Sequence, residues 1–185
     1  GMSYEDSLKK AGKVRFDVKK PGEYSHNEAE LTEDLAVFFQ LTGGRVEGLN
    51  SIVKTRSRAY ADPLVGEINM GSVRVAREAV RGTLWHETGH FLEASNSKIR
   101  EVAVAWRNSR AEGAPRQLAG YEKEEVAVPD KFSDPYVGRV YNGDKYTEVV
   151  SVGLERWRSP ESMLNHYLQD PDHFNLITGI LTSDF

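Results

Sequence analysis

The chain has 185 residues, of which 39% are hydrophobic and 28% are charged. This length and composition are typical of one globular domain and exclude a repeat array or a disordered chain. The 24 basic and 28 acidic residues give a net charge of -4, so we expect neither nucleic acid nor an anionic membrane surface as a partner.

The sequence contains no cysteine, which excludes disulfides, thiolate nucleophiles, iron–sulfur clusters and cysteine-bound zinc. Any metal must therefore be bound by histidines and carboxylates. No apolar run approaches the roughly 18 residues of a membrane-spanning helix, and residues 1–10 lack the apolar segment of a signal peptide. We therefore expect a cytoplasmic protein.

The first half of the chain is predicted to form a small sheet and one helix. Three segments have the alternation or the neighbouring turn residues of strands: 13–19, 51–60 and 65–70. Between the first two, residues 27–41 carry apolar side chains at helical spacing, and Gly43 and Gly44 follow as a helix stop.

The second half is predicted to be helical on either side of a long irregular segment. The predicted helices are 81–94, 98–110, 147–157, one that starts at Ser159 and Pro160, and a last one from Pro171 to about Leu181. Residues 113–142, which contain several prolines and glycines, are expected to form a loop that carries function or covers a site. The sequence therefore predicts one α+β domain over residues 1–185.

Residues 86–90 have the sequence His-Glu-Thr-Gly-His, inside a predicted helix. Helical residues four apart share a face, so His86 and His90 can bind one metal ion, for which zinc is the natural choice. Glu87 lies beside them, where its carboxylate can take a proton from a metal-bound water. The alternative is a chance alignment of two histidines on an exposed helix. Four apolar neighbours favour a buried helix instead: Leu84, Trp85, Phe91 and Leu92.

A catalytic zinc needs a third protein ligand and one open position. A third histidine six residues after His90 is excluded, because Asn96 stands there. Glu93 is predicted to be a solvated helix residue, since three ligands in a row along one helix cannot close around one ion. Glu148, at the start of a later predicted helix, is the preferred ligand, and an ordinary first-turn glutamate is the alternative. Glu155 shares its face and is either an alternative ligand or a residue behind the ligands.

A resemblance to the gluzincin metallopeptidases rests on His86, Glu87, His90 and a glutamate on a later helix. Tyr141, seven residues before Glu148, is similar to the tyrosine-then-glutamate arrangement of the anthrax lethal factor family. The second half also resembles metallopeptidase-like segments of phage-associated proteins. These resemblances cover residues 59–182, whereas residues 1–58 have no recognised counterpart.

The resemblance implies a zincin-like fold, bound zinc, Glu87 as the base that activates water and Tyr141 as a donor to the oxyanion. The family pattern is broken after Ser151, where Val152 replaces an acid, so the carboxylate that usually orients a histidine is missing.

Several other residues are open to two interpretations. Tyr136 and Tyr146 compete with Tyr141 for the role of donor. The strand 65–70, just before the active-site helix, is either the sheet edge that pairs with an extended substrate or a plain core strand. The remaining histidines are predicted to be surface or structural residues: His26, His166 and His173.

Two functions are compatible with the sequence. The first is a zinc-dependent endopeptidase that hydrolyses an unidentified peptide or protein substrate through a metal-activated water. The second is a phage-derived structural or assembly protein whose metal site stabilises the fold or is vestigial. The intact Glu87 favours the peptidase, because a structural site needs no base, whereas the missing acid favours the second function weakly. The location is then cytoplasmic or phage-associated.

Overall fold

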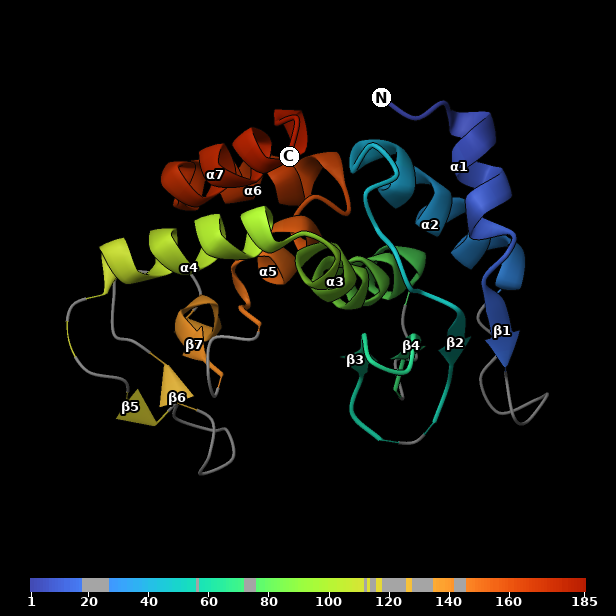
Figure 1. Ribbon diagram of the computed structural model, residues 1–185, viewed down its shortest axis with the longest axis horizontal. Helices are drawn as coiled ribbons and strands as arrows, with labels where there is room; N and C mark the ends of the chain where they lie inside the picture. Colours follow the sequence, from blue (N-terminus) through green and yellow to red (C-terminus); the bar gives the residue numbers. More distant parts are fainter. Residues whose placement is uncertain are drawn as a thin grey trace.

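In the computed structural model, helix α3 (Arg77–Ser95) runs through the middle of the molecule and carries the His-Glu-His residues. Figure 1 shows the strands of both sheets below α3, and several helices above it. Among these helices are α2 (Glu28–Leu41), α6 (Pro160–Gln169) and α7 (Pro171–Thr182). The structure describes residues 1–17, 27–55, 57–71, 76–111, 113, 116–117, 126–127, 135–141 and 146–185.

The larger sheet has four strands in the order β1-β2-β4-β3. Their bounds are Arg15–Asp17 for β1, Ser51–Val53 for β2, Tyr60–Asp62 for β3 and Glu67–Asn69 for β4. Strands β1, β2 and β4 are parallel, whereas β3 is antiparallel to β4, with Ala61 opposite Ile68. The predicted small mixed sheet in the first half is therefore confirmed, although its strands are shorter than the predicted segments.

The strand of segment 65–70 does not form the edge of this sheet. β4 lies between β2 and β3, so of the two interpretations of this segment the plain core strand is confirmed and the edge that pairs with substrate is wrong. The reason is a hairpin: the side chain of Asp62 accepts hydrogen bonds from the N–H groups of Leu64 and Val65, which turns the chain back and lets β3 cover β4. β3 is the edge strand at this side of the sheet.

Residues 1–58, to which the sequence assigns no role, support α3. Helix α1 (Tyr4–Ala11), which was not predicted, is capped by the side chain of Ser3 and packs on α2. On α2, Asp34 pairs with Arg77 and Arg81 of α3 at 3.0 and 2.8 Å. The carbonyl of Asp34 also accepts the indole N–H of Trp85 at 2.9 Å. These bonds fix α2 along α3 and hold the helix that carries the site.

The helices of the second half begin at the caps that the sequence indicates. Asn96, Ser159 and Asp170 accept backbone N–H groups at the starts of α4 (Ser97–Arg110), α6 and α7. The predicted helix 147–157 is shorter and forms α5 (Val149–Glu155).

A second sheet lies near the end of α4. It is antiparallel, with the order β5-β6-β7, and its strands are Arg116–Gln117, Val126–Ala127 and Arg139–Val140. A short 3₁₀ helix, Pro135–Gly138, precedes β7. Most of the predicted loop 113–142 lies outside the described residues. The expectation that it carries function or covers a site is therefore tested only at the described residues of this segment.

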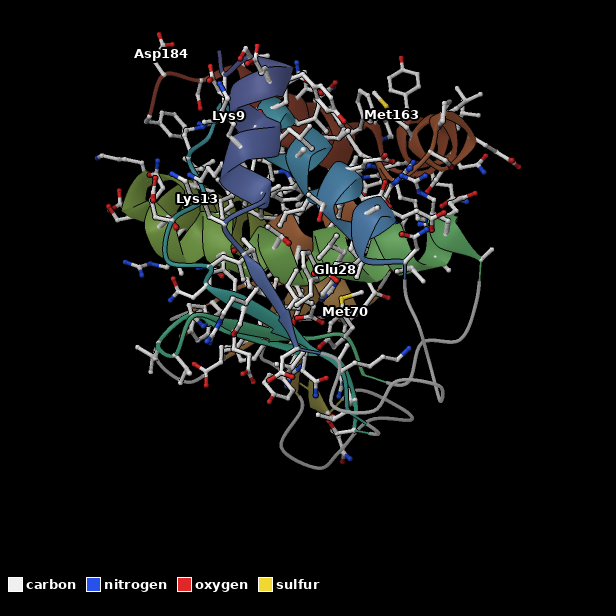
Figure 2. All side chains as sticks on the ribbon, turned by 90° about the vertical axis from the view of Figure 1, so that its right-hand side faces the viewer. Lys9, Lys13, Glu28, Met70, Met163 and Asp184 are labelled. Atoms are coloured by element: carbon white, nitrogen blue, oxygen red, sulfur yellow. The ribbon has the colours of Figure 1, made fainter. Side chains whose placement is uncertain are left out.

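One cluster of buried apolar side chains extends from Ala11 to Ile180 and joins both halves of the chain. Figure 2 shows Met70, at the end of β4, between the sheet and α3. On the other side α5 approaches α3 closely, because a Cβ added at Gly89 would lie only 2.8 Å from Cα of Ser151. The fold is therefore α+β, with α3 held between the sheet and α5. Within the described residues, no helix combines the length and the apolar character that a membrane crossing requires.

Candidate metal centre

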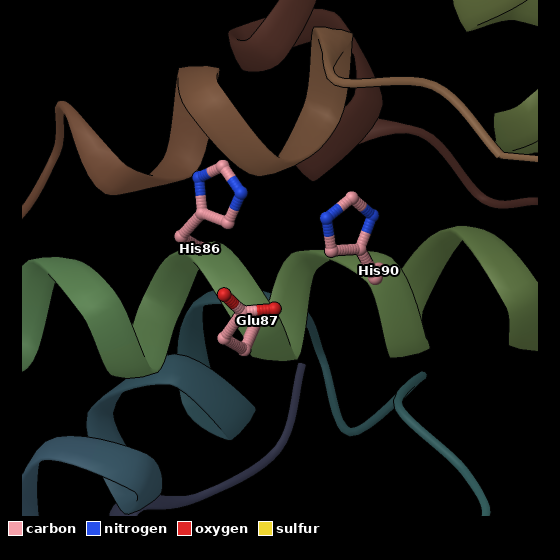
Figure 3. A group of neighbouring side chains, drawn as sticks. All are labelled: His86, Glu87 and His90. Carbon is pink, nitrogen blue, oxygen red and sulfur yellow. The ribbon is translucent and has the colours of Figure 1, made fainter. Parts of the chain in front are cut away.

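Three side chains of α3 converge at one place on the helix. His86 and His90 project from the same face, and Figure 3 shows Glu87 between them in that view. The possible ligand atoms of the three residues lie within 4.8 Å of one another. The imidazoles are 16% and 11% exposed and Glu87 is 6% exposed, so the group is shielded from bulk water yet still reachable from one side.

Glu148, directly before α5, meets both histidines. Its Oε2 lies 3.2 Å from Nε2 of His86 and 3.4 Å from Nε2 of His90. In a tetrahedral zinc site with bonds of about 2.0–2.1 Å, two ligand atoms are about 3.3–3.4 Å apart. Oε2 of Glu148 therefore lies from each of the two nitrogens at the distance that separates neighbouring corners of such a site. Glu148 is buried and its carboxylate contacts both imidazoles, which distinguishes it from the ordinary first-turn glutamate that was the alternative.

Hydrogen bonds orient these ligand atoms. Glu155 contacts Nδ1 of His86 at 2.9 Å, the nitrogen on the far side of the ring from Glu148. It therefore stands behind His86 and supplies the carboxylate that the sequence lacks at Val152. Ser151 donates its hydroxyl to Oε2 of Glu148 at 2.8 Å. The arrangement leaves Nε2 of His86 turned toward the position of a metal.

The charges of the site require a cation. Burial lowers the pKa of His86, but the hydrogen bonds with Glu148 and Glu155 raise it to about 10. Burial raises the pKa of Glu148, but the charge of His90 and the hydrogen bonds with both histidines bring it well below its usual range. At neutral pH a proton on His86 thus balances the carboxylates when no metal is bound. A divalent ion placed between the same atoms would balance the negative charge of the carboxylates in the same way.

Glu87 has a different environment from Glu148. Burial raises the pKa of Glu87, and the nearby imidazoles of His86 and His90 oppose this shift. A carboxylate whose pKa is raised accepts a proton more readily at neutral pH, as a general base must. The two glutamates therefore differ in chemistry although both lie beside the same histidines.

Three tyrosines surround the opening of the site. Tyr141 donates its hydroxyl to Oε1 of Glu148, and burial together with the charge of Glu148 raises its pKa, so it keeps its proton. Tyr136 accepts a hydrogen bond from Arg58 at 3.1 Å, and Tyr146 packs edge-on against Tyr141. Of the three, Tyr141 is the one whose hydroxyl is bonded to the residues around the metal position in the described structure.

A cavity of about 870 Å³ connects these residues with the edge of the sheet. Tyr60 and Ala61 of β3 line it together with His86, Glu87, His90 and Glu148. Two arginines also line it, Arg58 and Arg139, and the guanidinium of Arg139 lies 4.4 Å from the centre of the Tyr141 ring. The cavity is large enough for a peptide segment that lies along β3.

Glu93 is completely buried, so the prediction that it is solvated is wrong. Its Oε1 accepts the N–H of Thr147 at 2.7 Å, and its Oε2 accepts the hydroxyl of Thr147 at 2.8 Å. Burial raises the pKa of Glu93 to about 7, although these hydrogen bonds lower it. The partner is 54 residues away in sequence, which is why the helical pattern alone places Glu93 in solvent.

His166 and His173 form a buried pair, so they are not surface residues. Nε2 of His173 lies 2.7 Å from the carbonyl of Val149 and must donate to it. Nδ1 of His173 therefore accepts from Nε2 of His166 at 3.0 Å. Burial lowers the pKa of His166 to about 3 and that of His173 to about 4, so both rings are neutral and structural. His26 lies outside the described residues.

Sequence reasoning brought His86, Glu87, His90, Glu148, Tyr141 and Glu155 into one site, and the structure places them together. It missed Arg58 and Arg139, because a single arginine has no periodic pattern or motif that marks it. Comparisons with protein-family models, with curated proteins and with solved structures gave no match. The functional assignment therefore depends on the geometry of the site.

Proposed function

We propose that this protein is a zinc-dependent peptidase. The observation that carries the proposal is the position of Glu148, whose Oε2 lies 3.2 and 3.4 Å from the Nε2 atoms of His86 and His90. Two neutral imidazoles and one carboxylate are the protein ligands of many catalytic zinc sites, and they leave a fourth position open. The cavity beside them gives a substrate access to that position.

Each residue has a distinct part in the proposed reaction. A zinc ion held by His86, His90 and Glu148 would act as a Lewis acid that lowers the pKa of a water to about 7 and polarises the scissile carbonyl. Glu87 takes the proton of the attacking water and delivers it to the amine that leaves. Tyr141 donates a hydrogen bond to the oxyanion that develops on the carbonyl oxygen. The peptide lies extended along the edge strand β3, which lines the same cavity.

The alternative function, a phage-derived structural or assembly protein with a vestigial site, gains no specific support. It was favoured by the absence of an orienting carboxylate at Val152. Glu155 contacts Nδ1 of His86 at 2.9 Å and can orient the imidazole in place of that carboxylate. A site that only stabilises the fold would also have no use for Glu87, which is buried beside the histidines.

The test combines zinc content with hydrolysis. Purified protein should bind about one zinc per chain, and His86→Ala or His90→Ala should abolish this binding. Glu87→Gln should keep the zinc and lose hydrolysis of unfolded casein by orders of magnitude, because the amide cannot accept the proton of water. Equal zinc in the double alanine variant, or hydrolysis at the wild-type rate by zinc-loaded Glu87→Gln, would overturn the proposal.

A further inference from the structure

The backbone around Glu148 is held by side chains from two other helices. On one side, the carboxylate of Glu93 from α3 accepts both the N–H and the hydroxyl of Thr147 at 2.7 and 2.8 Å. On the other side, His173 of α7 donates to the carbonyl of Val149 at 2.7 Å. The residue between these two anchors is Glu148, whose carboxylate meets both histidines.

Burial of the Glu93 carboxylate costs free energy, and the packing of the helices does not by itself require a carboxylate at this place. Glu93 has no exposed surface, and removing a charged group from water is unfavourable unless hydrogen bonds compensate it. Helices α3 and α5 already pack closely at Gly89 and Ser151, so close contact between these helices does not depend on a carboxylate at Glu93. What the carboxylate adds is a pair of directed bonds to the residue immediately before Glu148.

We infer that Glu93 is a positioning residue for the metal site, which acts through Thr147 to set the place of Glu148. This inference rests on the proposed zinc site. Glu93 lies one turn past His90 on the same helix, so the two histidines and the anchor of Glu148 are fixed to one rigid element. Helix α3 then sets the distance between Glu148 and the histidines, because it also holds the segment directly before α5 in place.

The expected consequence is a loss of zinc affinity when the anchor is removed. Metal sites depend on ligand atoms that are held to within about 0.5 Å. Loss of a residue that orients a ligand typically weakens metal binding by about 10- to 100-fold. Glu93→Gln keeps an acceptor for the N–H of Thr147 but offers an amide N–H₂ to its hydroxyl, which must then accept instead of donate. Thr147→Val removes the hydroxyl, with its bonds to Glu93 and to the N–H of Val149, and keeps the bond from its own N–H. We expect a loss near 10-fold for each variant.

The experiment measures the zinc dissociation constant of folded protein by competition with a chelator. Thr147→Ser keeps the hydroxyl and should restore affinity to within about twofold of wild type. Thr42→Val is the matched control, because Thr42 is also fully buried and its hydroxyl bonds to the carbonyl of Phe38, away from the site. It should lower the thermal midpoint of the metal-free protein and leave zinc affinity unchanged. The visible absorption of bound Co²⁺ reports distortion of the coordination geometry in each variant.

The outcomes separate this inference from the proposed function. If wild type binds zinc and His86→Ala does not, but Glu93→Gln and Thr147→Val bind zinc as wild type does, Glu93 is only structural and the inference is wrong. If Glu93→Gln fails to fold, Thr147→Val against Thr147→Ser decides the question in the same way. If wild type binds no zinc, the proposed site and this inference both fail.

Discussion

Zinc binding at this site should release a proton, because His86 is protonated when no metal is present. Its hydrogen bonds with Glu148 and Glu155 outweigh burial and raise its pKa to about 10. A metal binds only the neutral imidazole, so zinc and this proton compete for the same nitrogen lone pair. Glu148 has a pKa well below its usual range and adds no proton to the exchange near neutral pH.

The size of the effect follows from that competition. Below the pKa of His86, the proton concentration falls tenfold for each rise of one pH unit. Because this proton competes with zinc for His86, the apparent zinc affinity should rise about tenfold per pH unit. From about pH 6.5 to about pH 8.5 the affinity should increase roughly 100-fold, which is about 2.7 kcal/mol. About one proton per zinc should be released over this range.

Two measurements test the prediction. Chelator competition at several pH values gives the slope of affinity, and calorimetry in two buffers with different ionisation enthalpies counts the protons released. Glu155→Gln is the matched variant, because it removes the charge behind His86 and should move the upper end of the slope to lower pH. Zinc affinity that stays constant across this range would show that His86 is already neutral, and the charge analysis of the site would be wrong.

Three further predictions concern rate and stability. Tyr141→Phe should lower the hydrolysis rate by roughly 10²-fold at saturating zinc, because the oxyanion loses a donor; an unchanged rate would remove Tyr141 from the reaction. Gly89→Ala should cost about 1–3 kcal/mol in urea unfolding, since its Cβ would lie 2.8 Å from Cα of Ser151, whereas Gly179→Ala, with no atom near its Cβ, should not destabilise. Protonation of His166 and His173 in the unfolded chain should lower stability as pH drops below about 6.5, because their pKa values in the fold are about 3 and about 4, while the raised pKa of Glu93 offsets part of this loss; a His166→Asn variant that loses as much stability as wild type between about pH 7 and about pH 5 would contradict this.

The sequence predicted the features that depend on local spacing. The positions of His86 and His90 on one helix face follow from a separation of four residues, and the cap at Ser159 and the helix start at Pro171 follow from residue type. The small helix α1 could also have been found, because Ser3 followed by Asp6 is a capping pattern at its start.

Features that depend on distant partners were not predictable in this way. Glu93 was placed in solvent because its partner Thr147 comes from a segment that the helical pattern of α3 does not contain. The edge strand β3 was not recognised because it has only three residues, too few for an alternating pattern to distinguish it from the loop around it. Glu155 was left with two possible roles, since only the observed ring orientation of His86 places it at Nδ1.

The contrast between Glu87 and Glu148 explains how one group of residues can both hold a metal and act as a base. Glu148 accepts hydrogen bonds from Ser151 and Tyr141 and lies against both imidazoles, so it stays ionised, as a metal ligand must. Burial raises the pKa of Glu87, which favours uptake of a proton. A pair of carboxylates whose surroundings move their pKa values apart is the arrangement that acid–base catalysis requires. The histidines lower the pKa of both glutamates, but only Glu148 also accepts hydrogen bonds from them, whereas at Glu87 burial has the largest effect.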